Sequence, residues 1–168
     1  MNIYGSYASQ KVLQLENKNE KFFIRGRATD AKRTISTHRI LLAPIQFGAG
    51  VKGKFIDAMQ VGTPSITTSI GAEAMKGSLE WNGFIADDLG DFIEEAVLLY
   101  NDKAAWSLAQ KNGIKIINER YSSPHFADSF ISVLENLDIQ KHRQHNFIGQ
   151  ILNHHTMQST KYMSLWIE

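Results

Sequence analysis

A short glycine-rich segment combines residue types that suit the binding of a phosphorylated ligand. Gly48, Gly50 and Gly53 match the pattern G-x-G-x-x-G. Glycine lets the backbone come close to a phosphate, and the free N–H groups at the start of a following helix attract anions. Lys52 and Lys54 add positive charge at the same place, where the helix dipole alone favours acidic residues. We therefore favour a bound anion over the alternative, a tight turn with solvated lysines.

Polar residues further along extend this candidate site. Asp57 lies three residues after Lys54, one helical turn deeper on the same face, where a carboxylate can accept hydrogen bonds from ribose hydroxyls. The alternative is a surface acid that pairs with Lys54. Thr68, Gly71 and Glu73 lie at and just beyond the tip of the next predicted strand, and ligands bind beyond the carboxyl ends of such strands. We expect these three to line a wall, the alternatives being an ordinary strand residue at Thr68 and a helix-start acid at Glu73.

Alternating strands and helices must position these residues. Apolar or β-branched runs predict strands at residues 2–5, 21–26, 39–44, 65–69 and 83–86. Helical periodicity predicts helices at residues 10–15, 30–35, 54–61, 88–100, 103–119 and 126–137, with a helical tail at 140–168. This order implies an α/β fold, with a single Rossmann-like parallel sheet and flanking helices. The run at 39–44 is apolar on both faces, as expected at the centre of such a sheet.

Length and composition limit the classes of protein. A chain of 168 residues suits one domain, in which we expect residues 1–122 to be Rossmann-like and residues 123–168 to be a helical C-terminal extension of the same domain. The net charge of +1 argues against nucleic acid or an acidic membrane as the main partner. No cysteine is present, which favours a reducing, cytoplasmic location. No apolar run approaches the roughly 20 residues that cross a bilayer, so we expect no transmembrane segment.

The segment from Pro44 to Met75 resembles the C-terminal, donor-binding domain of the group 1 glycosyltransferases, retaining enzymes with the GT-B fold. The matching residues are Pro44, Gly48-Ala49-Gly50, Lys52, Lys54, Asp57-Ala58-Met59, Gly62, Pro64-Ser65, Thr67-Thr68 and Gly71-Ala72-Glu73. Weaker similarity extends from Ile3 to about Tyr121. The resemblance thus implies that residues 1–122 form a nucleotide-sugar-binding domain.

The resemblance implies a donor site at the glycine loop and the helix that follows it. Its donor-binding residues are Gly48, Ala49, Gly50, Lys52, Lys54, Asp57, Thr68 and Glu73. The loop and the helix start hold the diphosphate of a nucleotide sugar, which is the donor substrate, and no cofactor is implied. Asp57 binds the ribose, while Thr68 and Glu73 line the sugar or base side.

Departures from the family pattern bear on activity. Asp57 stands where the family usually has glutamate, so its carboxylate reaches less far by one methylene. An upstream acid of the family falls near Ala49, which has no carboxylate to contact the sugar. The family's enzymes also hold their site between two Rossmann-like domains, and this chain has room for only one. Transfer needs an acceptor surface and a cleft that excludes water, so activity of the chain alone stays open and we identify no catalytic residue.

We expect the nucleotide-sugar-binding half of a glycosyltransferase that moves a hexose to a glycan or glycoconjugate acceptor in polysaccharide synthesis. One alternative is a non-catalytic nucleotide-sugar-binding module that works with a separate acceptor domain. Another is a dinucleotide-binding domain of an oxidoreductase, which the pattern G-x-G-x-x-G suggests. Against it, the loop follows the third predicted strand, and Glu73 matches only loosely the acid expected about 20 residues after the glycine pattern.

The tail carries large apolar residues and histidines. The apolar residues at its end are Met157, Met163, Leu165 and Trp166. They predict packing against the domain, a separate acceptor domain or a second copy of the chain in a homo-oligomer. His142 and His145 share a helical face, and His154-His155 follow, but zinc usually takes three or four ligands and no nearby acid completes a set. We therefore predict surface histidines and no metal site.

Overall fold

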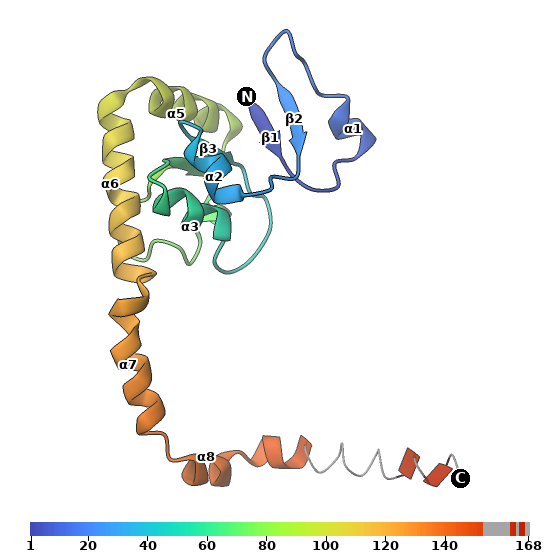
Figure 1. Cartoon of the computed structure of the whole chain (residues 1–168), viewed down its shortest axis with the longest axis vertical. Helices are drawn as coiled ribbons and strands as arrows, with labels where there is room; N and C mark the ends of the chain where they lie inside the picture. The colour runs from blue at the N-terminus through green and yellow to red at the C-terminus, as the bar shows by residue number, and fades with distance from the viewer. Residues whose placement is uncertain (153–161, 164, 167–168) are drawn as a thin grey trace. The chain divides into compact units, whose positions relative to one another are not determined.

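The computed structural model describes residues 1–152, 162, 163, 165 and 166. The chain divides into two compact units, residues 1–122 and 123–168. The first unit contains β1 (Asn2–Tyr4), α1 (Gln10–Leu13), β2 (Phe23–Gly26), α2 (Ala31–Ser36), β3 (Leu41–Ala43), α3 (Gly53–Gln60), β4 (Ser65–Thr67), α4 (Ser69–Ala72), β5 (Gly83–Ile85), α5 (Leu89–Asn101) and α6 (Lys103–Arg120) (Figure 1). The second contains α7 (Ser123–Glu135) and α8 (Ile139–His145).

Strands β3, β4 and β5 form a parallel sheet with β4 in the centre. All of β4 is buried, whereas Leu41 and Leu42 in β3 are half-buried. The prediction that β3 lies at the centre of the sheet is wrong, because among the described residues it pairs with β4 alone. Its apolar sequence reflects cover on both faces instead: Leu41 packs on one hydrophobic cluster and Leu42 on another. Burial of both faces of a strand does not indicate whether each of its edges is hydrogen-bonded to another strand.

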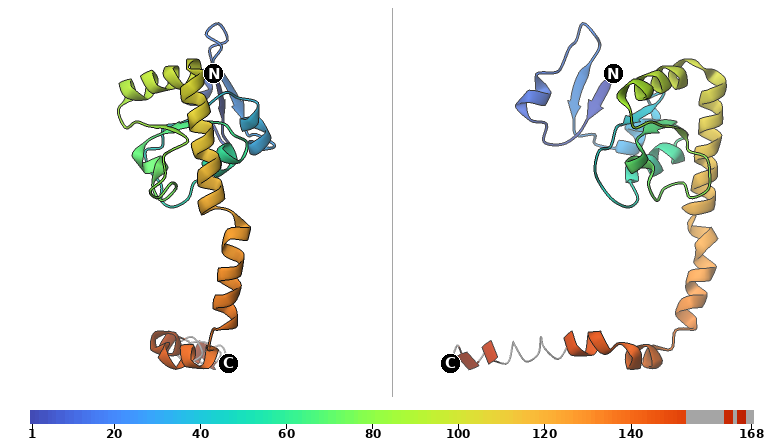
Figure 2. Two further views of the ribbon diagram at one scale, coloured as in Figure 1. Left: turned by 90° about the vertical axis from the view of Figure 1, so that its left-hand side faces the viewer. Right: turned by 180° about the vertical axis from the view of Figure 1, so that it is seen from behind.

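Strands β1 and β2 form a second parallel sheet, so the strands fall into two sheets where one was predicted. Periodicity identifies strands but not their hydrogen-bonded neighbours, which explains the difference. Side chains link the two sheets at His38. Its Nε2 lies 3.1 Å from Nδ2 of Asn2, and its ring meets the Tyr4 ring edge to face at 5.9 Å between centroids. Figures 1 and 2 show β1, at the N-terminus, between β2 and β3.

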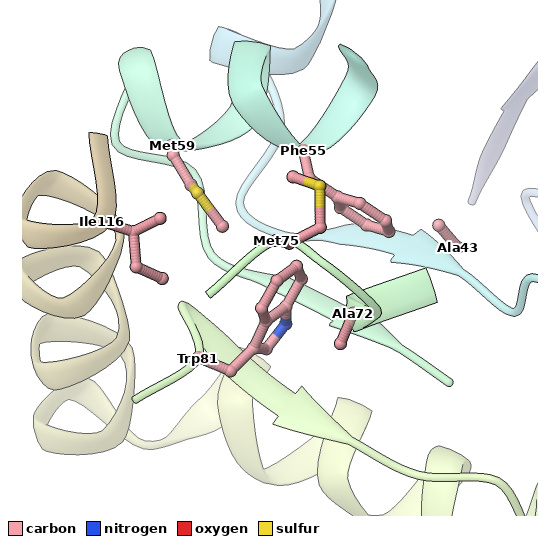
Figure 3. Packing of buried hydrophobic residues seen from close by; sticks show 7 residues of the cluster. All are labelled: Ala43, Phe55, Met59, Ala72, Met75, Trp81 and Ile116. Carbon is pink, nitrogen blue, oxygen red and sulfur yellow. The ribbon is translucent and has the colours of Figure 1, made fainter. Parts of the chain in front are cut away.

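One hydrophobic cluster joins α3, α6 and the three-stranded sheet (Figure 3). Its buried members are Ala43, Phe55, Met59, Ala72, Met75, Trp81 and Ile116. The Phe55 and Trp81 rings meet edge to face with centroids 5.2 Å apart, and the Trp81 indole N–H donates to the Ser65 carbonyl at 3.2 Å. The helix that follows the glycine loop is therefore anchored in the core at its first turn.

The second cluster covers the opposite face of the same sheet, because side chains alternate along a strand. Its buried members are Ile66, Ala86, Phe92, Leu99 and Ala109. Figure 2 shows α5 and α6, which supply several of them, beside this sheet. Asp88 begins α5 by accepting from the N–H groups of Gly90 and Asp91, and Asp102 caps α6 in the same way.

Short polar caps set several helix starts. Asp30 accepts a hydrogen bond from the Arg33 N–H and begins α2, as predicted. The strand predicted to continue to Ser69 ends instead at Thr67. Thr68 leaves the strand and caps α4, because its hydroxyl accepts from the Gly71 N–H. A β-branched run thus contains both a strand end and a helix cap.

The second unit consists of helices with exposed apolar side chains. In and just after α7 these are Phe126, Phe130, Ile131, Val133, Leu134 and Leu137. At the end of the tail, Met163, Leu165 and Trp166 are exposed, while Met157 and His154-His155 lie outside the described residues. Within the described part of the chain, no helix is long and apolar enough to span a membrane.

Candidate functional site

The candidate site begins at the carboxyl ends of β3 and β4. Because Ala43 pairs with Thr67 in parallel strands, the loop after β3 and helix α4 start at the same edge of the sheet. The Thr67 hydroxyl donates to the Ala43 carbonyl at 2.9 Å. The Thr68 hydroxyl donates to the Ile45 carbonyl at 2.5 Å and accepts from the Gly71 N–H at 3.2 Å. Thr68 therefore ties the start of the glycine loop to α4.

Gly71 occupies a tightly packed position in α4. A Cβ atom added there would lie 1.8 Å from Oγ1 of Thr67. The position therefore requires glycine so that α4 can pack directly on the end of β4. This is a structural role next to the site, whereas the sequence suggested a wall residue.

The glycine loop has a backbone that other residues adopt rarely. Gly48 has a φ of 132° and Gly50 a φ of 70°. A Cβ atom added at Gly48, Gly50 or Gly53 would meet no atom within 4 Å. Conformation, rather than crowding within the chain, thus accounts for glycine at Gly48 and Gly50, and the surface above this backbone is open to a ligand.

The start of α3 presents free hydrogen-bond donors. Lys52 is the N-cap residue, and its side chain makes no capping bond. In the part of the chain that the structure describes, the N–H groups of Gly53 and Lys54 have no acceptor, since the first N–H paired in this turn is that of Phe55 with the Lys52 carbonyl. These donors and the helix dipole favour an anion at this end of α3.

The two lysines differ in their surroundings. Lys52 is half-buried, its Nζ donates to the Ile70 carbonyl at 2.6 Å, and its backbone N–H points at Sδ of Met75 at 3.3 Å. Lys54 is exposed, and its amine makes no hydrogen bond or ion pair with the described residues. Lys52 therefore fixes the end of the loop to α4, while the exposed Lys54 amine has no partner among the described residues.

Asp57 lies one turn further along α3 and is half-buried. Its carboxylate has no hydrogen-bond or ion-pair partner among the described residues, where the ion pair found joins Lys115 and Glu119 at 3.9 Å. The alternative of a surface acid paired with Lys54 is thus not seen. An unpaired, half-buried carboxylate is available to accept hydrogen bonds from hydroxyl groups.

Glu73 ends α4 with an extended backbone and an exposed side chain. Within the described residues its carboxylate has no polar partner. The next residue, Ala74, has a φ of 61°, which is strained for a residue with a Cβ atom. Such strain is often found beside functional sites.

A hollow of about 450 Å³ adjoins the start of α3. It is lined by Pro44, Ile45, Gln46, Phe47, Gly48, Ala49, Lys52 and Lys54. Four of the predicted site residues, Gly48, Ala49, Lys52 and Lys54, thus meet around it, whereas Gly50, Asp57, Thr68 and Glu73 do not line it. No group of three or more His, Cys, Asp or Glu side chains in the described ranges is placed to hold a metal.

The hollow also includes residues that the sequence did not single out. Ile45, Gln46 and Phe47 complete its wall. They lie in the same strand-to-helix connection as the glycines, immediately before Gly48. Their position in the chain was therefore the signal that could have identified them.

Comparison with protein-family models matches residues 1–102 to a model described as "Glycosyl transferases group 1". The chain belongs to the group 1 glycosyltransferases. The family predicted from the segment between Pro44 and Met75 is thus confirmed. A search of curated proteins gave no match.

Solved structures resemble this glycosyltransferase chain in fold. A variant of S. aureus TarM in complex with fondaparinux, α-GlcNAc-glycerol and UDP has a TM-score of 0.64 and 18% identity, over 79% of this chain and 28% of that one. A second TarM structure has a TM-score of 0.63 at the same identity and coverage. Anabaena HepE in complex with UDP-glucose has a TM-score of 0.60 and 14% identity, over 81% of this chain and 40% of that one. The predicted α/β fold is confirmed, in a chain that spans less than half the length of these proteins.

Proposed function

We propose that this chain is the donor-binding half of a group 1 glycosyltransferase and holds a nucleotide diphosphate sugar at the start of α3. The observation that carries the proposal is that the N–H groups of Gly53 and Lys54 have no acceptor among the described residues and follow an open glycine loop, in a chain of this family. Two of the solved neighbours contain UDP or UDP-glucose, which supports a uridine nucleotide as the donor.

The residues at the start of α3 divide the work of holding the diphosphate. The N–H groups of Gly53 and Lys54 donate to its oxygens, as does the backbone of the loop from Gly48 to Gly50. The Lys54 amine neutralises the charge that grows on the diphosphate as the sugar leaves. Lys52 adds a fixed positive charge while holding the loop to the Ile70 carbonyl.

Residues beyond the diphosphate hold the rest of the donor. The Asp57 carboxylate accepts hydrogen bonds from the ribose hydroxyls, because it has no partner among the described residues and lies one turn further along α3. Thr68 acts by positioning the loop through the Ile45 carbonyl. Glu73 lines the sugar or base side of the donor from the end of α4.

Transfer of the sugar requires an acceptor surface and a cleft closed to water. A separate acceptor domain would supply both, with a hexose moving to a glycan or glycoconjugate. The sugar-containing ligands in the TarM structure support this class of acceptor. The cysteine-free composition supports a cytoplasmic location.

Calorimetric titration of the full chain with UDP, UDP-glucose and NAD tests the proposal. We expect binding of both uridine nucleotides, weakened about tenfold in Lys54→Ala and in Asp57→Ala, since each loses a charge-assisted hydrogen bond. Lys115→Ala is the matched control, because that lysine lies on the surface of α6. Equal affinity in the parent and both site variants would show that the site lies elsewhere.

Two further readouts separate the alternatives. Preferential binding of NAD would favour a dinucleotide-binding domain. Hydrolysis or transfer of the glucosyl group by the purified chain would show an enzyme that is active alone. Binding without turnover, even with an added glycan acceptor, would favour the non-catalytic module.

A further inference from the structure

Phe47 is an exposed aromatic residue at the candidate site. Its side chain is 87% exposed and borders the hollow together with Lys54. Single exposed apolar residues are common on protein surfaces, so exposure alone does not indicate a contact. The position of Phe47 is more informative, because an aromatic ring beside a few polar groups in a hollow is typical of a small-ligand site.

The loop that carries Phe47 is held at both ends. On the N-terminal side of Phe47, the Ile45 carbonyl accepts a hydrogen bond from the Thr68 hydroxyl at 2.5 Å. On the C-terminal side, the Lys52 amine donates to the Ile70 carbonyl at 2.6 Å. Both anchors belong to the segment around α4. They keep the loop, and with it Phe47, at the edge of the sheet where the donor is proposed to bind.

The proposed donor has its parts in a fixed order: nucleoside, diphosphate, hexose. With the ribose at Asp57 and the diphosphate at the N–H groups of Gly53 and Lys54, the donor runs toward the start of α3. The hexose follows the diphosphate and therefore extends beyond the helix start, toward the loop and the hollow.

The hollow offers the hexose two kinds of contact. Gln46 provides an amide group, and Phe47 provides a ring face. A hexose in its chair form has a face of C–H groups that packs well on an aromatic ring, and burying that face removes apolar surface from water. Ala49 adds no polar side chain to the wall.

We propose that Phe47 packs against the C–H face of the donor hexose and selects sugar-bearing nucleotides over the free nucleoside diphosphate. This inference rests on the proposed donor site and adds a sugar-contacting residue to it. Phe47 contacts neither the diphosphate nor the ribose, so its loss affects one part of the donor and leaves the others in place.

Calorimetry with two ligands isolates that contact. Phe47→Ala is expected to weaken binding of UDP-glucose about threefold to tenfold and to leave the affinity for UDP within about twofold of the parent. Phe47→Trp is expected to retain the preference for UDP-glucose. Val51→Ala is the matched control, since Val51 is an exposed apolar residue of the same loop outside the wall of the hollow.

Proton NMR supplies a readout that a change in loop structure would not imitate. The ring current of Phe47 is expected to shift the hexose protons of bound UDP-glucose upfield. Phe47→Ala is expected to abolish this upfield shift and to leave the chemical shifts of the bound uridine protons unchanged. Equal losses for UDP and UDP-glucose, or no loss for either, would overturn the role of Phe47 alone. Failure of the parent chain to bind any of the nucleotides would overturn the proposed function and, with it, this inference.

Discussion

The two parts of the first unit, residues 1–26 and residues 27–122, differ in how deeply they are buried. Every buried residue of the described chain lies in the second part, and the first has none. Both hydrophobic clusters pack on the sheet of β3, β4 and β5, whereas β1 and β2 connect to it through contacts of His38. The candidate site therefore stands on the stable part of the unit, and the first part contributes little to its support.

The largest expected effect comes from a core residue beneath the site. Phe55 is fully buried in α3, and Phe55→Ala should lower the free energy of unfolding by about 3–5 kcal/mol because it leaves a cavity. Phe23 in β2 is half-buried with its ring under the Arg25 guanidinium, and Phe23→Ala should cost about 1 kcal/mol. Chemical denaturation measures both. Similar losses in the two variants would remove the distinction between the two parts.

A smaller effect is expected from glycines in the two parts. Gly71→Ala should lower the free energy of unfolding by about 1–3 kcal/mol. The added Cβ atom would clash with Oγ1 of Thr67, 1.8 Å away, and would force α4 away from β4. Gly5 has no atom within 4 Å of an added Cβ, so Gly5→Ala should change stability by less than about 1 kcal/mol. Thermal and denaturant unfolding compare them. A tolerated alanine at Gly71 would mean that α4 can shift, and that the close contact with Thr67 is not required.

The smallest expected effect concerns the link between the sheets. His38→Ala removes the contact with Asn2 and the edge-to-face contact with Tyr4, and should lower stability by about 1 kcal/mol. Amide hydrogen exchange should become faster in β1 and β2 and stay unchanged in β4, which is the internal control. Faster exchange throughout both sheets would show that the two parts unfold together and do not differ in stability.

The sequence predicted those features that depend on neighbours along the chain. The helices predicted at residues 30–35 and 88–100 begin at Asp30 and Asp88, since each of these caps bonds to N–H groups two or three residues away. The glycine loop and the start of α3 are likewise local. Gly48, Ala49, Lys52 and Lys54 therefore meet around the hollow as the pattern suggested.

The features that the sequence did not reveal depend on contacts between distant residues. Among the described residues, β3 pairs with β4 alone, and β1 and β2 form a separate sheet. These arrangements depend on which strand edges form hydrogen bonds, and an apolar sequence pattern carries no information about that. The bond from Lys52 to the Ile70 carbonyl and the bond from Thr68 to the Ile45 carbonyl also cross between segments. They give Lys52 and Thr68 structural roles that residue type alone did not suggest.

The two anchors of the glycine loop leave residues 46–51 as a span fixed at its ends. Immobilising one residue costs about 1–2 kcal/mol of conformational entropy. The free energy of binding of a ligand that orders this span is therefore less favourable by that cost. Affinity is therefore adjustable without altering any atom that meets the ligand. A span stiffened in its bound shape would bind more tightly through preorganisation alone, and a longer one would bind more weakly.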